Sequence, residues 1–306
     1  MKRIGIFISS FSKKFIKKQG ELLLDFGSGS ACFYLDGKLI ESKSSCFTDF
    51  KKNNFKKIRL VERGTVVNFK YARSFLDQTI QNLIVKKKVW PRFNGYYLFS
   101  NDATAVEKLI VQKVLLSLKY GSWKMLSKKG AVKTTQGGVI DIGFDLTEVI
   151  LGIGTGNVVA KTIKSGSRSF TKIIRSVVRD KYQLDVSWVG ADKIKKEITV
   201  DDFLLTTQVI KQKITVRGKD IYTFVPKTIV IEASVLQKPL LEKVEELFDE
   251  IKLFFSKVTT NTLMNSIEQG IDLWGDGSKL AGLDSYLSKK LQTTVNKGQA
   301  SYEVHK

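Results

Sequence analysis

The chain has 306 residues, of which 42% are hydrophobic, and 51 Lys and Arg against 30 Asp and Glu give a formal net charge of +21. This length predicts two lobes of about 100–150 residues each and excludes a single small core. The composition excludes wholesale disorder, and no apolar run approaches the ~20 residues of a membrane-spanning helix. Two cysteines (Cys32 and Cys46) and one histidine (His305) provide no disulfide framework, zinc site or histidine-based catalysis, as in a protein of the reducing cytoplasm.

Residues 1–19 predict an amphipathic helix that binds an anionic membrane. Apolar residues recur at steps of three and four, on one helical face, with lysines around it. This face consists of Ile4, Phe7, Ile8, Phe11 and Phe15. Each lysine close to an anionic bilayer contributes about 1 kcal/mol to binding. Two alternatives are a core helix of the first lobe and a secretory signal, although no small-residue cleavage site follows the apolar stretch.

From residue 21 the pattern predicts strands, then helices, and the order repeats in the second half. Strands are expected at 22–26, 32–35 and 38–40, with a tight hairpin at 36–37, and helices at 75–84 and 106–118. The second half opens on a similar strand at 137–143, followed by strands at 148–151 and 158–163 around the turn 154–157. Further helices are expected at 169–182, 191–197 and 240–258. A duplicated unit of this kind indicates two similar lobes facing one cleft.

Each half contains an aspartate at the end of its first strand, directly before a turn of small residues. These aspartates are Asp25 and Asp141. Glycines in such a turn let backbone N–H groups approach phosphate oxygens, and an aspartate at this place can hold Mg²⁺ through water. Two such turns at equivalent places predict a phosphate-binding cleft.

These residues resemble the MreB-type bacterial actin-like proteins, the rod-shape-determining cytoskeletal ATPases, over nearly the whole chain. The matching segments are 24–30, 139–149, 163–170, 191–198, 215–220 with 226–227, and 271–278 with 280–284. The resemblance implies a duplicated actin-like (ribonuclease H-like) α/β ATPase fold, with lobes at 20–137 and 138–306 around a nucleotide cleft. It also implies ATP and Mg²⁺ as cofactors, with Asp25 and Asp141 near the ion.

The resemblance further implies a set of nucleotide contacts and a place in the cell. The nucleotide contacts would be Asp25, Gly27, Ser28, Gly29, Ser30, Asp141, Gly143, Gly166, Ser167, Asp192, Lys193, Ile194, Lys195, Gly275, Asp276, Gly277 and Ser278. The protein would be a cell-shape filament subunit on the cytoplasmic face of the membrane. Its partners would be copies of itself, paralogous actin-like subunits and anionic lipid, and no specific nucleic acid is expected.

The sequence departs from the family at the residues that face phosphate. In the second loop, Phe144, Asp145 and Leu146 replace a run of glycines and a threonine, and Ala31 replaces a threonine after the first loop. Asp276 interrupts a triple glycine. The family's Glu-Glu-Pro segment, whose carboxylate helps to position the attacking water, is replaced by 124–130, which includes Ser127, Lys128 and Lys129 and contains no acidic residue. We therefore expect ATP binding with weakened or lost hydrolysis.

Two other classes of protein remain as alternatives. An ATP-dependent phosphotransferase of the sugar-kinase type would share the fold, but no recognisable transfer motif supplies a free Asp or Glu. A basic nucleic-acid-binding scaffold would suit the net charge, although a genome poor in G and C would also enrich lysine. No helix-turn-helix, zinc finger or aromatic RNA-binding signature is present.

Overall fold

The computed structural model describes residues 20–51, 54–86, 89, 92–200 and 212–303, and all structural statements refer to these. The predicted membrane-binding helix, with Ile4, Phe7, Ile8, Phe11 and Phe15, lies outside the described residues. Within the described part, none of the helices has the length and apolar character needed to cross a bilayer.

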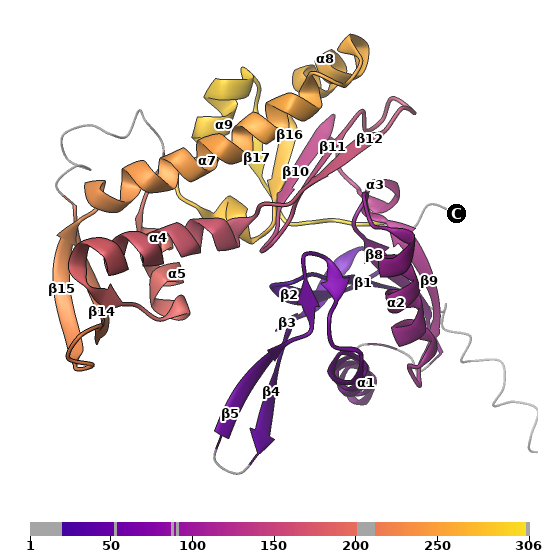
Figure 1. The fold of residues 1–306 in the computed structure, drawn as a ribbon. Helices are drawn as coiled ribbons and strands as arrows, with labels where there is room; N and C mark the ends of the chain where they lie inside the picture. The colour runs from indigo at the N-terminus through magenta and orange to yellow at the C-terminus, as the bar shows by residue number, and fades with distance from the viewer. Residues whose placement is uncertain (1–19, 52–53, 87–88, 90–91, 201–211, 304–306) are drawn as a thin grey trace, which may run out of the picture.

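Two five-stranded sheets with the same topology form the centre of the molecule (Figure 1). The first has the order β3-β2-β1-β8-β9 and the second the order β12-β11-β10-β16-β17. In each sheet the three strands that come first in sequence pair antiparallel with one another. The other two strands follow on the far side of the first strand, and each pairs parallel with its neighbour. The predicted duplicated α/β architecture is therefore confirmed.

The strands of the first sheet are β1 (Glu21–Phe26), β2 (Ser30–Leu35), β3 (Lys38–Ser44), β8 (Asn94–Phe99) and β9 (Ser122–Ser127). Those of the second are β10 (Gly138–Ile142), β11 (Thr147–Leu151), β12 (Val159–Ile163), β16 (Ile271–Trp274) and β17 (Val295–Lys297). Smaller sheets and hairpins contain β4 (Cys46–Lys51), β5 (Asn54–Arg59), β6 (Val61–Glu62), β7 (Thr65–Val66), β13 (Leu184–Asp185), β14 (Lys213–Asp220) and β15 (Pro226–Glu232).

Helices cover each sheet where their apolar stripes match its buried face. The helices are α1 (Phe69–Val85), α2 (Ala105–Leu116), α3 (Lys128–Ala131), α4 (Ser167–Tyr182), α5 (Trp188–Glu197), α7 (Ser234–Phe255), α8 (Thr260–Gln269), α9 (Leu283–Leu291) and the 3₁₀ helix η2 (Asp276–Lys279). Helices α4 and α7 pack against each other, and α7 also contacts β12 and β15 (Figure 1). Helix α7 begins at Ser234 rather than at the predicted 240, and Pro239 lies inside it.

The alternation of β1 assigns its side chains to two different cores. Leu22 and Leu24 face the core of the first sheet and its helices, whereas Leu23 faces the opposite side. There Leu23 joins a buried cluster that includes Val139 and Trp274 of the second sheet. Because this cluster takes residues from both sheets, it ties the two halves together.

The C-terminal tail closes this junction. Tyr302 is 1% exposed, and its ring meets Tyr34 and Trp274 edge to face at centroid distances of 5.3 and 5.9 Å. Its backbone pairs with Val132 just after α3. The residues after Val295 are mostly polar and carry no periodic pattern, so nothing in the sequence indicates this contact. The predicted lobe boundary at residue 137 falls between α3 and β10 and stays a prediction.

Candidate functional site

The two predicted phosphate loops occupy equivalent turns of the two sheets. In the first loop the Gly27 N–H donates to the Ser30 carbonyl (2.9 Å), and in the second the Gly143 N–H donates to the Leu146 carbonyl (2.9 Å). Asp25 and Asp141 are each the last residue but one of the strand before the loop. The structure therefore brings these predicted residues together from opposite halves of the chain.

Phe144 fills the space between the two loops. A Cβ placed on Gly29 would lie 2.9 Å from the Phe144 Cβ, so only glycine permits this approach. The Phe144 ring contacts Trp188 edge to face (6.0 Å) and lies under the Arg59 guanidinium (5.2 Å). The bulky ring that replaces a family glycine thus builds an aromatic and cationic wall.

Asp145 has cationic and N–H partners of its own. Its carboxylate pairs with the Arg168 guanidinium (3.2 Å) and accepts from the Arg63 N–H (3.1 Å), in the turn between β6 and β7. In the same turn the Gly64 N–H donates to Ser28 Oγ (3.4 Å). A carboxylate beside a phosphate loop would repel the phosphate, and the Arg168 guanidinium offsets its charge.

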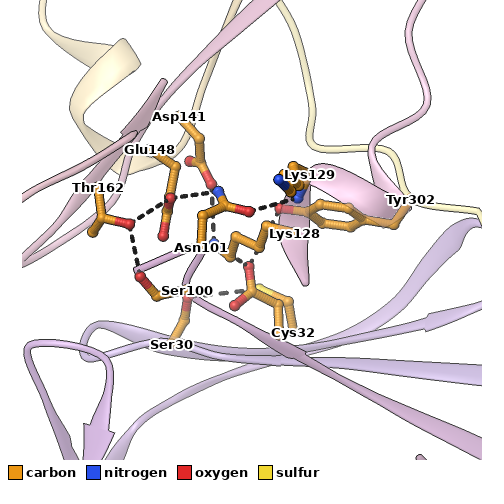
Figure 2. Close-up of polar contacts among 11 residues, drawn as sticks. Ser30, Cys32, Ser100, Asn101, Lys128, Lys129, Asp141, Glu148, Thr162 and Tyr302 are labelled. Carbon is orange, nitrogen blue, oxygen red and sulfur yellow. Dashed lines mark hydrogen bonds and ion pairs between the residues drawn. The ribbon is translucent and has the colours of Figure 1, made fainter. Parts of the chain in front are cut away.

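Lys128 places its ammonium group between the two strand-end aspartates. The Lys128 Nζ atom lies 3.0 Å from Asp25 Oδ2 and 3.1 Å from Asp141 Oδ2. Figure 2 shows the side chain extending from the end of β9 towards Asp141, with Tyr302 beside it. The Tyr302 hydroxyl donates to Asp25 Oδ2 at 3.5 Å. Burial lowers the pKa of Lys128, but the attraction of Asp141 and Asp25 outweighs it, so its pKa lies well above the ordinary value.

This arrangement does not fit a magnesium ion between the two aspartates. Mg²⁺ requires octahedral oxygen ligands at about 2.0–2.1 Å and usually retains several waters. Here the Lys128 ammonium group lies 3.0 and 3.1 Å from one oxygen of each carboxylate. Mg²⁺ could use these two oxygens as ligands only if the ammonium group were displaced. The two aspartates predicted to lie near Mg²⁺ do lie together, but the Lys128 ammonium group occupies the place between them where the ion was expected.

A polar network next to the inner pocket joins the two halves. Glu148 accepts from Asn101 Nδ2 (2.7 Å) and Thr162 Oγ1 (2.9 Å), and the Thr162 hydroxyl also pairs with that of Ser100 (2.9 Å) (Figure 2). Burial raises the pKa of Glu148 above its ordinary value. Both of these bonds go to Glu148 Oε2, whereas the buried Oε1 atom has no hydrogen-bond partner among the described residues.

An outer cavity of about 570 Å³ lies against both phosphate loops and α5. Binding sites for small ligands commonly measure ~300–1,000 Å³. Predicted residues that line this cavity are Ser28, Gly29, Ser167, Asp192, Lys195 and Asp276. Asp192 is paired with Lys195 Nζ (2.6 Å) and Lys196 Nζ (2.9 Å), and Asp276 with Lys279 Nζ (2.7 Å). The lining of the outer cavity thus combines the aromatic rings of Phe144 and Trp188 with cationic side chains.

The other predicted residues lie at different places around the cleft. A second cavity of about 580 Å³ is lined by Asp25, Gly27, Ser28, Gly29, Ser30, Asp141, Gly143, Gly275, Asp276 and Ser278, among others. Gly166 caps the N-terminus of α4, where the Ser167 N–H donates to the Gly143 carbonyl. Gly277 packs on Ile142, whose Cγ2 leaves no room for a Cβ. Lys193 is exposed and Ile194 is buried in the core, so neither faces the outer cavity.

Arg59 and Trp188 are among the outer-cavity residues that sequence reasoning missed. The Arg59 Nη1 atom is buried and has no hydrogen-bond partner among the described residues. The guanidinium pairs with Glu62 through Nε at 3.9 Å, so Nη1 remains available as a charged donor to an anionic ligand. Arg59 belongs to the β4–β5 hairpin, for which no motif was recognised, so the sequence carried no signal for it.

Two duplicated five-stranded sheets, joined at their centre and opening on paired phosphate-loop turns, define an actin-like protein. Solved structures agree with this class. MreB5 of Spiroplasma citri bound to ADP has a TM-score of 0.78 at 15% identity, covering 92% of both chains, and its AMPPNP complex has a TM-score of 0.77. The MamK double helical filament has a TM-score of 0.69 at 14% identity, covering 91% of this chain and 94% of MamK.

The sequence identifies the family within this class. The family model described as "MreB/Mbl protein" matches residues 50–304, so the chain belongs to the MreB/Mbl family. The cell shape-determining protein Mbl of Bacillus subtilis (strain 168) is 22% identical over 253 residues, which cover 79% of this chain and 74% of Mbl. The Mbl protein of Bacillus cereus is 21% identical over the same length. The resemblance inferred from the motifs is confirmed.

Proposed function

We propose that this chain is a filament subunit of the cell-shape cytoskeleton that binds an adenine nucleotide in the outer cavity. The observation that carries the proposal is the cavity itself, where the two phosphate loops meet and the unpaired Nη1 atom of Arg59 is buried. Structures of MreB5 with ADP and with AMPPNP support nucleotide binding, and the MamK filament supports self-assembly. Nucleotide state would then set the stability of the filament.

We further propose that hydrolysis is weakened. Each of the four acidic side chains of the inner pocket has a partner: Lys128 pairs with Asp25 and Asp141, Arg168 with Asp145, and Asn101 with Glu148. A carboxylate paired with a cation, as Asp25, Asp141 and Asp145 are, is a poor proton acceptor for an attacking water. The same observation argues against a phosphotransferase, which needs a free base for the hydroxyl of its substrate.

Assembly is the direct test of the filament proposal. The net charge of +21 makes subunits repel one another, and this repulsion extends further at low salt, since the Debye length is ~30 Å at 0.01 M and ~10 Å at 0.1 M. We therefore expect filaments in raised salt or on anionic vesicles, but not in 0.01 M salt alone. Sedimentation and electron microscopy over a salt series, with neutral vesicles as the control, measure this. A chain that stays monomeric in every condition, alone and mixed with an active paralogue, contradicts the proposal.

Membrane attachment is proposed for residues 1–18, outside the described part of the chain. A chain that lacks these residues should lose pelleting with anionic vesicles. The double variant Phe7→Ser/Phe11→Ser keeps every lysine and should lose most of it as well, because the apolar face drives insertion. Co-sedimentation decides between this and purely electrostatic attraction. Equal pelleting of the complete, shortened and doubly substituted chains would remove the proposed anchor and, with it, the location at the inner membrane face.

A further inference from the structure

The position of Lys128 follows from the topology of the first sheet. Strands β1, β8 and β9 run parallel, so their carboxyl ends meet at one edge. Asp25 lies at that end of β1, and Lys128 is the first residue after β9. The short helix α3, closed by the Val132 N–H on the Lys128 carbonyl (3.1 Å), turns the chain here towards the second sheet. The side chain therefore enters the cleft from a fixed backbone.

The charges around Lys128 are arranged as they would be around a metal ion. Two carboxylates from opposite halves of the molecule each direct one oxygen at the same ammonium group, at 3.0 and 3.1 Å. The side chains of all three residues are largely shielded, with exposures of 15% for Lys128, 18% for Asp25 and 10% for Asp141. Two buried carboxylates so close together need a cation between them, since like charges in a shielded site repel strongly. The ammonium group meets that need without a metal.

We propose that Lys128 is the built-in cation of this cleft, and that the chain binds nucleoside di- and triphosphates without a divalent metal. The claim that nucleotides bind without a divalent metal rests on the proposed nucleotide binding. The claim that Lys128 excludes a divalent ion concerns the protein alone. Lys128 joins the two halves of the molecule electrostatically in both the free and the nucleotide-bound state. Chelators would then not release the nucleotide.

The first experiment measures the metal without nucleotide. Mn²⁺ is titrated into the complete chain and followed by electron paramagnetic resonance, for the wild type, Lys128→Ala, Lys128→Met and the control Lys129→Ala. Lys129 is the exposed neighbour, so its replacement removes the same charge from outside the pocket. We expect one new Mn²⁺ site in both Lys128 variants, lost again when Asp141→Asn is added. The wild type and Lys129→Ala should lack it.

Thermal unfolding gives an independent readout of the same event. A ligand that binds only the folded chain raises the melting temperature. Mn²⁺ and Mg²⁺ should therefore raise that of Lys128→Ala but not that of the wild type. A wild-type Mn²⁺ site that Asp141→Asn abolishes would overturn the proposal, and so would Lys128 variants that fold but gain no site. If neither Lys128 variant folds, the wild type and Asp141→Asn decide: equal Mn²⁺ binding by these two supports the proposal.

The second experiment adds nucleotide. Binding of a fluorescent N-methylanthraniloyl ADP is measured in Mg²⁺ and in EDTA. For the wild type we expect dissociation constants that differ by less than about threefold, and for Lys128→Ala a loss of about tenfold or more in EDTA. Wild-type binding that requires Mg²⁺ overturns the proposal but leaves nucleotide binding intact. No binding by any variant removes the proposed function, whereas the Mn²⁺ result still decides the role of Lys128.

Discussion

The purified chain is expected to release phosphate from ATP about 10²–10⁴ times more slowly than a family member whose phosphate loops and Glu-Glu-Pro segment are intact, because the removal of one positioned catalytic group commonly costs this much. The segment that replaces this motif contains Lys128, which is bound to two aspartates. An ammonium group that donates to two carboxylates cannot accept a proton from water. Glu148, another buried carboxylate nearby, accepts from Asn101 and Thr162 through its Oε2 atom.

The measurement is phosphate release at saturating ATP under assembling conditions, so that weak binding does not imitate slow chemistry. Single-turnover experiments with the same samples separate the chemical step from product release. The variant Phe144→Gly, which restores a family-like glycine, serves as a control. It should not recover the rate, because the missing proton acceptor lies elsewhere. A wild-type rate equal to that of the intact relative would contradict the expectation.

The second large effect concerns the tail. Replacement of Tyr302 by alanine should lower the free energy of unfolding by about 3–5 kcal/mol, the usual cost of deleting a buried aromatic side chain. The ring is fully enclosed between Tyr34 and Trp274, where both sheets contribute to one cluster. The matched control is Tyr302→Phe, which keeps the ring and loses only the hydroxyl bond to Asp25, at a cost of about 1 kcal/mol.

Urea unfolding followed by tryptophan fluorescence measures both variants, since Trp274 lies against the altered ring. We expect Tyr302→Ala to unfold at clearly lower urea than Tyr302→Phe. Equal midpoints for the two variants would show that the tail does not hold the two halves together.

The fold was predictable because the pattern is duplicated. Two apolar strands that end in an aspartate and a small-residue turn, each followed by a hairpin, predict the first three strands of each sheet, and these form as expected. The start of α7 was predicted too late, because a proline within a helix is unfavourable and Pro239 nevertheless lies inside this one. Strands β16 and β17 were not predicted as strands, since the first is four residues long and the second three.

The site was predictable only where a local motif contributes a side chain. The loops around Ser28 and Gly143 form where they were predicted, because a turn depends on the types of a few consecutive residues. The pairing of Lys128 with Asp25 and Asp141 depends on three strand ends far apart in sequence, so the lysine indicated a lost catalytic group but not a cation at the centre of the cleft. The role of Tyr302 was hidden for the same reason, since a single aromatic residue in a polar tail has no periodicity.

Nucleotide titration tests the central claim, that this altered cleft still binds an adenine nucleotide. Fluorescent N-methylanthraniloyl ATP is titrated into the wild type, Arg59→Ala and Arg73→Ala, with and without Mg²⁺. Arg59 lines the outer cavity, whereas Arg73 pairs with Asp77 on the surface of α1, so the two variants lose the same charge at different places. Saturable wild-type binding that ATP and ADP displace is predicted. Arg59→Ala should weaken it about tenfold or more, as for loss of a charged hydrogen bond, and Arg73→Ala should leave it unchanged. No saturable wild-type binding in either condition would contradict the account.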